Sequence, residues 1–281
     1  MIDQAESLRK LAKEDKKRAK VITVTSGKGG VGKSNFVVNL AISLQKKGKN
    51  VLIFDADLGM GNDDVLMGLY PQYNIFDAIF TNMDIKDIII EGPEGINLVP
   101  AGSGLNKAMQ LKPEQRDEFL KKLDVLDDYD YILMDTGAGV NKDVLEFIKA
   151  SEKLIVITTP EPTSITDAYS LIKATDYFKL KTSADIIVNK SFSYKEALDT
   201  FSKLNRTIER FLNIKVNYLG AISDDKKLVM SVRAQRPFIM SYPQCEASKD
   251  IDNISNKILG LQSENTQGAR GVFRKLFNIF S

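Results

Sequence analysis

Residues 25–35, TSGKGGVGKSN, combine glycines, lysines and a serine in a spacing that binds phosphate groups. They fit the pattern G-x-x-x-x-G-K-S, in which glycines let backbone N–H groups turn toward phosphate oxygens and the following helix N-terminus favours negative charge. Lys33 would contact the β- and γ-phosphates of a nucleotide, and the Ser34 hydroxyl would ligate Mg²⁺. The predicted nucleotide-binding residues of this loop are Gly27, Lys28, Gly29, Gly30, Val31, Gly32, Lys33, Ser34 and Asn35.

The loop holds a second lysine, Lys28, that the binding of a single nucleotide does not require. Lys28 stands at the start of the loop, where a side chain can point away from the nucleotide bound there. It is either a solvated surface residue or a charge supplied to the phosphates of a nucleotide held by a second subunit, as an arginine finger is elsewhere. Spacing alone leaves both interpretations open.

Three aspartates and an asparagine end apolar runs further along the chain. Asp55 and Asp57 end the run VLIFDAD, Asp135 ends YILMD, and Asn189 ends IIVN. Ligands bind at the carboxyl ends of the strands in open α/β sheets, so these side chains are candidates for a ligand site. As alternatives, the aspartates could cap following helices and the Asn-Lys pair could form a turn.

The elements that must position these residues alternate along the chain. The runs are rich in branched apolar residues and are not polar at alternate positions, as expected of strands covered on both faces. Segments with helical spacing separate most of them. The sequence therefore predicts an α/β fold, a doubly wound, mostly parallel sheet flanked by helices. The runs begin at Val21, Val51, Tyr131, Leu154, Ala184 and Val216, with a further strand expected in GINLVPAG from Gly95.

Composition excludes several classes of protein. Of the 281 residues, 43% are hydrophobic and 27% are charged, and a net charge of +2 does not indicate a chain built to coat nucleic acid. Histidine is absent, and the single cysteine, Cys245, allows neither a disulfide within the chain nor a zinc spacing. The sequence shows no secretory segment and no apolar run of transmembrane length. We therefore expect a reduced, cytoplasmic protein whose main partner is not nucleic acid.

The two ends of the chain differ from this pattern. Residues 1–20 form a charged helical arm, residues 21–260 hold the predicted globular domain, and residues 261–269 are predicted to be a polar linker. Residues 270–281 form an amphipathic helix of the kind that lies on anionic membranes, although its apolar face could instead dock on the protein itself, or alternate between the two with the nucleotide state. The predicted membrane-contacting residues are Phe273, Leu276, Phe277 and Phe280 on the apolar face, and Arg274 and Lys275 on the basic face.

The stretch KGGVGKS, residues 28–34, resembles the deviant Walker A motif of the MinD/ParA ATPases, and the similarity extends over residues 20–260. The resemblance implies ATP and ADP as ligands, Mg²⁺ as cofactor, and a homodimer in which two subunits enclose two ATP molecules. The early lysine, here Lys28, is the signature residue of that family and acts on the nucleotide of the other subunit. One departure is Ser223, where the family usually has proline.

The roles of the family's other residues transfer by position. Asp57 would position or activate the attacking water, so that Lys28, Lys33 and Asp57 are the expected catalytic residues. Ser34, Asp55 and Asp135 would hold Mg²⁺ and its waters. Gly137 and Gly139 would belong to a mobile second switch, and Asn189 would contact the adenine. Relatives that carry iron–sulfur clusters are excluded because they need paired cysteines.

The N-terminal arm distinguishes between close relatives. On physical grounds alone it would be a solvated tail, but DQAESLR, residues 3–9, matches the D-Q-A-x-x-L-R motif of the flagellar regulator family FlhG, also called FleN or YlxH. In that family the motif binds the GTPase FlhF and stimulates its hydrolysis, and the ATPase surface meets proteins of the flagellar switch complex (C-ring). The residues expected to activate FlhF are Asp3, Gln4, Ala5, Leu8 and Arg9.

Together these features predict a weak, regulatory ATPase that dimerises with ATP, cycles on and off the inner face of the cell membrane, and controls the number and placement of flagella. Two alternatives remain at this point. One is a division-site or polarity regulator of the MinD type that uses the same mechanism with other partners. The other is an adaptor that binds nucleotide without hydrolysing it.

Overall fold

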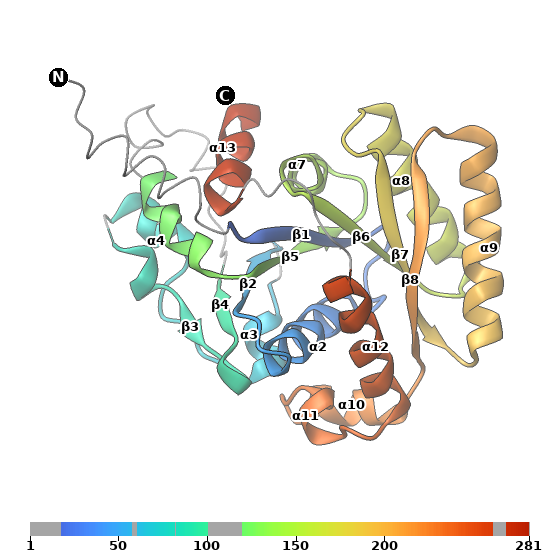
Figure 1. Cartoon of the computed structure of the whole chain (residues 1–281), viewed down its shortest axis with the longest axis horizontal. Coiled ribbons are helices and arrows are strands. Elements are labelled where there is room, and N and C mark those ends of the chain that lie inside the picture. The colour runs from blue at the N-terminus through green and yellow to red at the C-terminus, as the bar shows by residue number, and fades with distance from the viewer. Residues whose placement is uncertain (1–17, 58–60, 82, 101–119, 261–267, 281) are drawn as a thin grey trace.

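The computed structural model describes residues 18–57, 61–81, 83–100, 120–260 and 268–280. Across these ranges the chain forms an eight-stranded sheet in the order β3-β4-β2-β5-β1-β6-β7-β8, in which all neighbouring strands are parallel except β3 and β4. Figure 1 shows this sheet with helices on both faces, which confirms the predicted doubly wound α/β fold. The strands are β1 (Lys20–Ser26), β2 (Val51–Ala56), β3 (Ile90–Glu91), β4 (Asn97–Val99), β5 (Tyr131–Ala138), β6 (Lys153–Thr158), β7 (Ser183–Ser191) and β8 (Lys215–Ser223).

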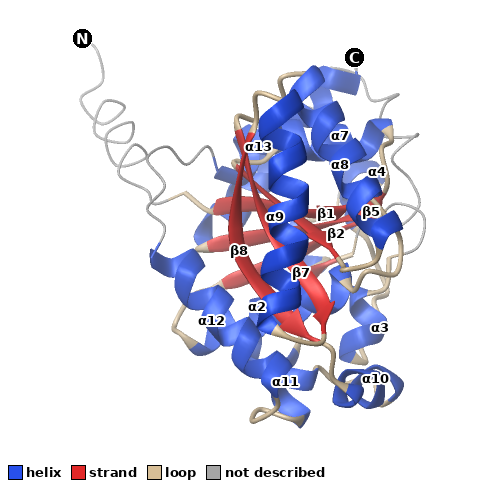
Figure 2. Cartoon of the chain, turned by 90° about the vertical axis from the view of Figure 1, so that its right-hand side faces the viewer, coloured by secondary structure: helices blue, strands red, loops and turns tan. Residues whose placement is uncertain are grey.

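The helices form two layers. In Figure 1, α2 and α12 lie below the sheet with α10 and α11, and α7, α8 and α13 lie above it. Figure 2 shows α9 running across β7 and β8, which it contacts. The α-helices are α2 (Lys33–Lys46), α3 (Asp63–Met67), α4 (Ile75–Phe80), α7 (Lys142–Ala150), α8 (Pro162–Tyr177), α9 (Tyr194–Phe211), α10 (Lys226–Arg233), α11 (Phe238–Ser241), α12 (Glu246–Gly260) and α13 (Gly268–Phe280), and the 3₁₀ turns are η1 (Ile85–Asp87), η2 (Pro93–Gly95) and η3 (Leu123–Asp128).

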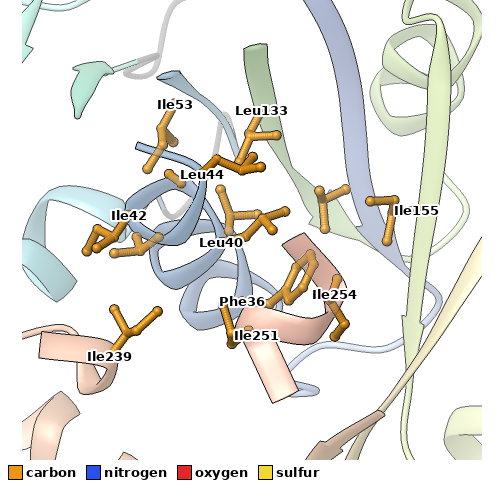
Figure 3. Packing of buried hydrophobic residues seen from close by; sticks show 14 of the residues in the cluster. Phe36, Leu40, Ile42, Leu44, Ile53, Leu133, Ile155, Ile239, Ile251 and Ile254 are labelled. Atoms are coloured by element: carbon orange, nitrogen blue, oxygen red, sulfur yellow. The ribbon is translucent and has the colours of Figure 1, made fainter. Parts of the chain in front are cut away.

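Helix α2, which follows the phosphate loop, is buried between the sheet and α12. Its Phe36 and Leu40 lie in one buried cluster with Leu133 of β5 and with Ile251 and Ile254 of α12 (Figure 3). Each such side chain contributes about 1.5–3 kcal/mol when it is fully buried. The packing therefore fixes α2 firmly, and with it the helix N-terminus that faces the predicted phosphates.

The strands agree closely with the apolar runs of the sequence. Each of the six main runs begins at the first or second residue of a strand, and the run expected after Gly95 contains β4. Strand β3 was not predicted. It has two residues, pairs antiparallel with β4 at the sheet edge, and is too short to leave a hydrophobic pattern in the sequence.

The C-terminal helix α13 is packed against the rest of the chain. Ala269, Val272, Phe273 and Leu276 are buried, and α13 contacts η3, α7 and β1. The Phe273 ring meets Phe54 of β2 edge-on, with ring centroids 5.1 Å apart. The structure thus shows the docked arrangement that the sequence left open, while contact with a membrane stays a prediction. Within the described ranges, no helix has both the length and the hydropathy to span a bilayer.

Two carboxylates of η3 hold the start of α13. Asp127 Oδ1 accepts a hydrogen bond from the Ala269 N–H at 2.7 Å, and Asp124 pairs with the Arg270 guanidinium at 3.1 Å. Gly268 has a φ of 70°, and a Cβ there would lie 2.5 Å from Asp127 Oδ1, so glycine is required. These contacts explain why the helix starts two residues before the predicted Arg270. The segments 1–17 and 261–267 lie outside the described residues.

Candidate nucleotide-binding site

The phosphate loop runs from the end of β1 to the start of α2. Its Gly30 and Gly32 have φ angles of 74° and 91°, which glycine adopts without strain. A Cβ on Gly27 would lie 2.2 Å from the backbone carbonyl of Asp167 in α8, so this position also requires glycine. The loop therefore has the backbone shape that turns N–H groups toward a phosphate, at the N-terminus of a helix that the core holds in place.

Lys33 and two aspartates meet at the carboxyl ends of the central strands. The Lys33 Nζ lies 3.0 Å from Asp135 Oδ1 of β5, and Asp135 is paired in register with Asp55 of β2. All three side chains are buried. The arrangement brings together the predicted phosphate-binding lysine and the two predicted magnesium carboxylates. In the sequence, Asp135 is 102 residues from Lys33 and 80 residues from Asp55.

Burial perturbs both carboxyl groups. It raises the pKa of Asp55 to about 7, with a smaller contribution in the same direction from the charge of Asp135. Burial also raises the pKa of Asp135, against the opposing effect of the Lys33 charge and of hydrogen bonds from Ser34 and Lys33. The site therefore favours a proton or a cation among its carboxylates.

These residues fit a magnesium ion that is bound together with a nucleotide. Mg²⁺ usually takes one or two carboxylates, keeps several waters, and fills its octahedron with substrate phosphates. Ser34, Asp55 and Asp135 offer that oxygen donor set, and buried carboxylates outnumber the buried Lys33 beside them. Among the described residues, no three or more acidic, histidine or cysteine side chains form a cage for a metal by themselves. The phosphates would supply the remaining ligands.

Asp57 lies between the magnesium carboxylates and the second glycine pair. Its backbone N–H donates to Asp55 Oδ1 at 3.0 Å, and its own Oδ1 would be 3.6 Å from a Cβ on Gly137. Gly139, with a φ of 88°, donates its N–H to the Ser26 carbonyl at 2.8 Å, which ties the end of β5 to the phosphate loop. Asp57, Gly137 and Gly139 are thus next to the loop, as the sequence predicted, and their roles in hydrolysis stay predictions.

The second lysine of the loop is engaged within its own chain. Lys28 Nζ donates to Glu161 Oε2 at 2.9 Å and to Thr163 Oγ1 at 2.8 Å, at the start of α8. The side chains of Lys28 and Glu161 are 37% and 63% exposed, so this pair lies at the surface. Sequence reasoning did not find Glu161 or Thr163, because their only signal is proximity after folding to a lysine more than 130 residues away.

Asn189 lies against the phosphate loop. Its side-chain amide donates to the Val31 carbonyl at 2.7 Å, and the amide nitrogen would be 2.3 Å from a Cβ on Gly32. The next residue, Lys190, has a φ of 57° and donates from Nζ to the Gly30 carbonyl at 2.8 Å. In this structure Asn189 and Lys190 therefore brace the loop; the predicted adenine contact of Asn189 stays a prediction, and Lys190 was not foreseen.

A further acidic residue, Asp63, was also missed. It is the first residue of α3 and is completely buried near Asp55, Asp135 and Lys33. In the sequence NDDV it is indistinguishable from an acidic residue at the start of a helix. Ser223, the departure from the MinD/ParA pattern, donates from its N–H and its hydroxyl to Asp250 of α12, which anchors the end of β8.

The predicted terminal sites fall partly outside the described residues. This is the case for the arm residues Asp3, Gln4, Ala5, Leu8 and Arg9, and for the side chains of Phe277 and Phe280. Of the other predicted membrane residues, Phe273 and Leu276 are buried against the protein, Lys275 is half-buried, and Arg274 is exposed.

Comparison with known proteins gives matches over most of the chain. A family model described as an AAA domain matches residues 19–188. The chain is 37% identical to the antiactivator FleN of Pseudomonas aeruginosa over 239 residues, with 85% of each protein covered. It is 35% identical to the flagellum site-determining protein YlxH of Helicobacter pylori over 270 residues, covering 94% of this chain and 91% of that protein. The solved structure of the cell division protein MinD from Aquifex aeolicus superposes with a TM-score of 0.70 at 25% identity, over 88% of this chain and all of that one.

Proposed function

The chain belongs to the FleN/YlxH group of MinD/ParA-type P-loop ATPases, and on this premise we propose that it is an ATP-dependent dimerising switch that regulates flagellar number and placement. Its rate of ATP hydrolysis is low, because hydrolysis serves to change where the protein is bound in the cell and not to make a product. It is cytoplasmic and attaches peripherally to the inner face of the cell membrane when it holds ATP.

The position of Lys28 is the observation that carries this proposal. Lys28 is bound to Glu161 and Thr163 at the surface of its own chain, not inserted among the loop's phosphate-binding groups. Exposed ion pairs of this kind contribute little to stability and exchange readily. The lysine is therefore free to leave Glu161 for the phosphates of a nucleotide bound to a second copy, where a desolvated charge pair is much stronger. Dimerisation then depends on the bound nucleotide.

The remaining site residues divide the work of hydrolysis. Lys33 and the loop N–H groups bind the β- and γ-phosphates. Ser34, Asp55 and Asp135 would hold Mg²⁺, which when bound would neutralise negative charge on the phosphates. Asp57 orients the attacking water and accepts its proton. Lys28 of the partner stabilises the charge on the phosphates as they separate, so the step is completed only in the dimer.

Helix α13 links this cycle to the membrane. Its apolar residues Val272, Phe273 and Leu276 are covered by the protein in the present state, and its exposed Arg274 suits an anionic lipid surface. A single short helix binds a bilayer weakly, but two copies on one ATP-held dimer gain by effective concentration. We propose that ATP favours release of α13 and that hydrolysis returns it to the docked state.

The partners follow from the family. Residues 3–9 bind the GTPase FlhF and stimulate its hydrolysis, and the surface of the ATPase domain meets proteins of the flagellar switch complex. Nucleic acid is not the main partner of a chain with a net charge of +2.

The coupling of nucleotide, dimer and membrane is tested with the full chain and the Asp57→Ala variant. Mass is measured by light scattering, and binding is measured by flotation with phosphatidylglycerol-containing liposomes, each with ATP and with ADP. We expect dimers and liposome binding with ATP only. Equal liposome binding with ATP and ADP would refute the membrane cycle, and a normal ATP dimer of Lys28→Ala would refute the trans role of Lys28.

The flagellar assignment is tested separately. A peptide of residues 1–20 is added to purified FlhF, and GTP hydrolysis is measured against a peptide with Asp3, Gln4 and Leu8 replaced by alanine. Stimulation by the native peptide alone supports the assignment. No stimulation of an active FlhF would leave a MinD-type regulator with another partner.

A further inference from the structure

Asp63 is a buried acid that the fold does not use. Its side chain has no solvent exposure, and among the described residues no N–H or hydroxyl group donates to either carboxylate oxygen, the polar group within reach being the carboxyl group of Asp135. Asp63 is the first residue of the short helix α3, yet its carboxylate accepts no hydrogen bond from the N–H groups of that helix. A buried, unpaired polar group destabilises a protein by about 1–3 kcal/mol, and by more when it is charged. An apolar side chain would fill this place at lower cost to the fold.

The surroundings of Asp63 point to the magnesium site. Its charged neighbours are Asp135, Asp55 and Lys33, and its carboxyl group comes within hydrogen-bond reach of Asp135. The preceding chain is held against the same site, because a Cβ on Gly61 would lie 2.2 Å from Asp55 Oδ2. The backbone just before α3 therefore passes close to the Asp55 carboxylate, which places the start of the helix beside the two proposed magnesium carboxylates.

The acidic groups of this cluster outnumber its cations. Asp55, Asp63 and Asp135 are all buried, and Lys33 is the buried cation that faces them among the described residues. Lys33 also has the phosphates of a nucleotide to bind, which would add further negative charge to the same space. A divalent cation is the ligand that neutralises such a group, and its waters are donors that an unpaired carboxylate can accept.

Resting on the proposed nucleotide function, we propose that Asp63 is a positioning residue of the magnesium site, which accepts from the water shell of the ion and strengthens the coupling between Mg²⁺ and nucleotide. Its place is outside the direct ligands, because the described carboxylates do not form a metal cage by themselves. Such outer partners hold the ligands and waters of a metal in place, and their loss typically weakens metal affinity about 10–100-fold.

The test measures the binding of Mn²⁺, a paramagnetic substitute for Mg²⁺, to the full chain with ADP by electron paramagnetic resonance. Asp63→Asn keeps the shape of the side chain, Asp63→Val fills the place with an apolar group, and Asp64→Asn removes the same charge from the half-exposed neighbour as a matched control. We expect both Asp63 variants to bind Mn²⁺ about tenfold more weakly than the wild type and the Asp64 variant. Mn²⁺ affinity equal to wild type in the Asp63 variants would overturn the proposal.

Two further measurements separate positioning from a structural role. In EDTA, the Asp63 variants should bind ADP at least as tightly as the wild type, because the proposed role of Asp63 requires the metal ion. Their metal-free thermal midpoints should be equal or higher, because an unpaired buried acid is gone. Weaker ADP binding in EDTA together with a lower midpoint would assign Asp63 to the fold and refute the inference. A wild-type chain that binds no Mn²⁺ with ADP would refute the proposed function itself.

Discussion

Two regions of this chain are packed together by different forces. One is the carboxyl edge of the sheet, and the other is the dock, the surface formed by η3, α7 and β1 on which α13 packs. At the carboxyl edge, Asp55, Asp63 and Asp135 are buried around Lys33, with more negative than positive charge. At the dock, Val272, Phe273 and Leu276 are buried against apolar neighbours, and the ion pair of Asp124 and the hydrogen bond of Asp127 lie at the rim. The first region has more acidic groups than cations, whereas the second is held mainly by apolar packing.

This difference assigns a direction to the switch. A region in which buried acidic groups outnumber the cations is stabilised by a bound cation, so binding of the nucleotide with its cation is expected to shift the equilibrium of the switch. A region held by apolar packing opens only when another event makes the open state more favourable. The sheet edge is therefore expected to drive the cycle, and the dock is expected to respond to it.

The largest expected effect separates hydrolysis from the response of the dock. Asp57→Ala removes the group that we propose accepts the proton of the attacking water, and phosphate release should fall about 10²–10⁴-fold while ATP still binds. With the sheet edge locked in its ATP state, α13 should remain released and liposome binding should persist. Single-turnover hydrolysis and liposome flotation of the same sample measure both. Loss of ATP binding in this variant would show that Asp57 has another role.

A second prediction concerns the unbalanced charge itself. The folded-state pKa of Asp55 is raised to about 7 from 3.8, so between these values the folded chain holds a proton that the unfolded chain has released. Without metal and nucleotide, the protein should therefore become less stable as the pH rises from about 4 to about 7. The equilibrium constant for folding should fall by at most about tenfold per pH unit. Denaturation in EDTA across this range measures the slope, and Asp55→Asn should reduce it.

Glu146 of α7 provides the control for that experiment. Burial raises its pKa to about 7 as well, but it lies outside the magnesium site. Glu146→Gln should reduce the pH slope with or without Mg²⁺ and ADP, whereas the contribution of Asp55 should disappear when Mg²⁺ and ADP are bound. If the contribution of Asp55 to the pH dependence of stability were the same with and without Mg²⁺ and ADP, the assignment of Asp55 to the magnesium site would be wrong.

A third prediction weakens the dock without changing the membrane-facing side of α13. Asp127→Ala removes the acceptor for the Ala269 N–H, and the loss of such a cap costs about 0.5–2 kcal/mol. Release of α13, and liposome binding with ADP, should rise about two- to thirtyfold. Glu246→Ala, which breaks an exposed ion pair with Lys249 away from the dock, is the matched control. Unchanged liposome binding by Asp127→Ala would mean that the rim does not hold the helix.

The smallest expected effect lies at the surface lysine. Glu161→Ala frees Lys28 from an exposed ion pair, and such pairs contribute little. The ATP concentration that half-saturates dimerisation should fall by about two- to fivefold, with no change in monomeric ADP affinity. Thr163→Val should act in the same direction. Weaker dimerisation of Glu161→Ala would indicate that Glu161 belongs to the dimer interface instead.

Much of the fold could be predicted because its strands are covered on both faces. Such strands must be apolar throughout, and the runs from Val21 and Val51 show this directly in the sequence. Strand β3 could not be predicted, because two paired residues at an edge need no hydrophobic pattern. The direction in which α13 packs was also undetermined, since one apolar face suits lipid and protein equally.

The candidate site shows the same division. The glycine loop and the strand-end aspartates follow from local spacing, and the register of Asp55 with Asp135 confirms that they meet. The partners of Lys28 and the brace from Asn189 to Val31 depend on contacts between distant segments, which a single sequence does not encode in any local pattern. Asp63 was missed for another reason: aspartate is usually exposed, so its sequence position gave no indication that this side chain is fully buried.

The position of α13 over the sheet has a consequence for solubility. The helix covers the buried ring of Phe54 and the neighbouring apolar residues of β1 and β5, so its departure leaves a groove of core side chains facing water. Exposed patches of that kind promote aggregation. The membrane-bound form must therefore either keep the groove shielded or exist briefly, and a chain cut before Gly268 is expected to precipitate when it is purified at high concentration.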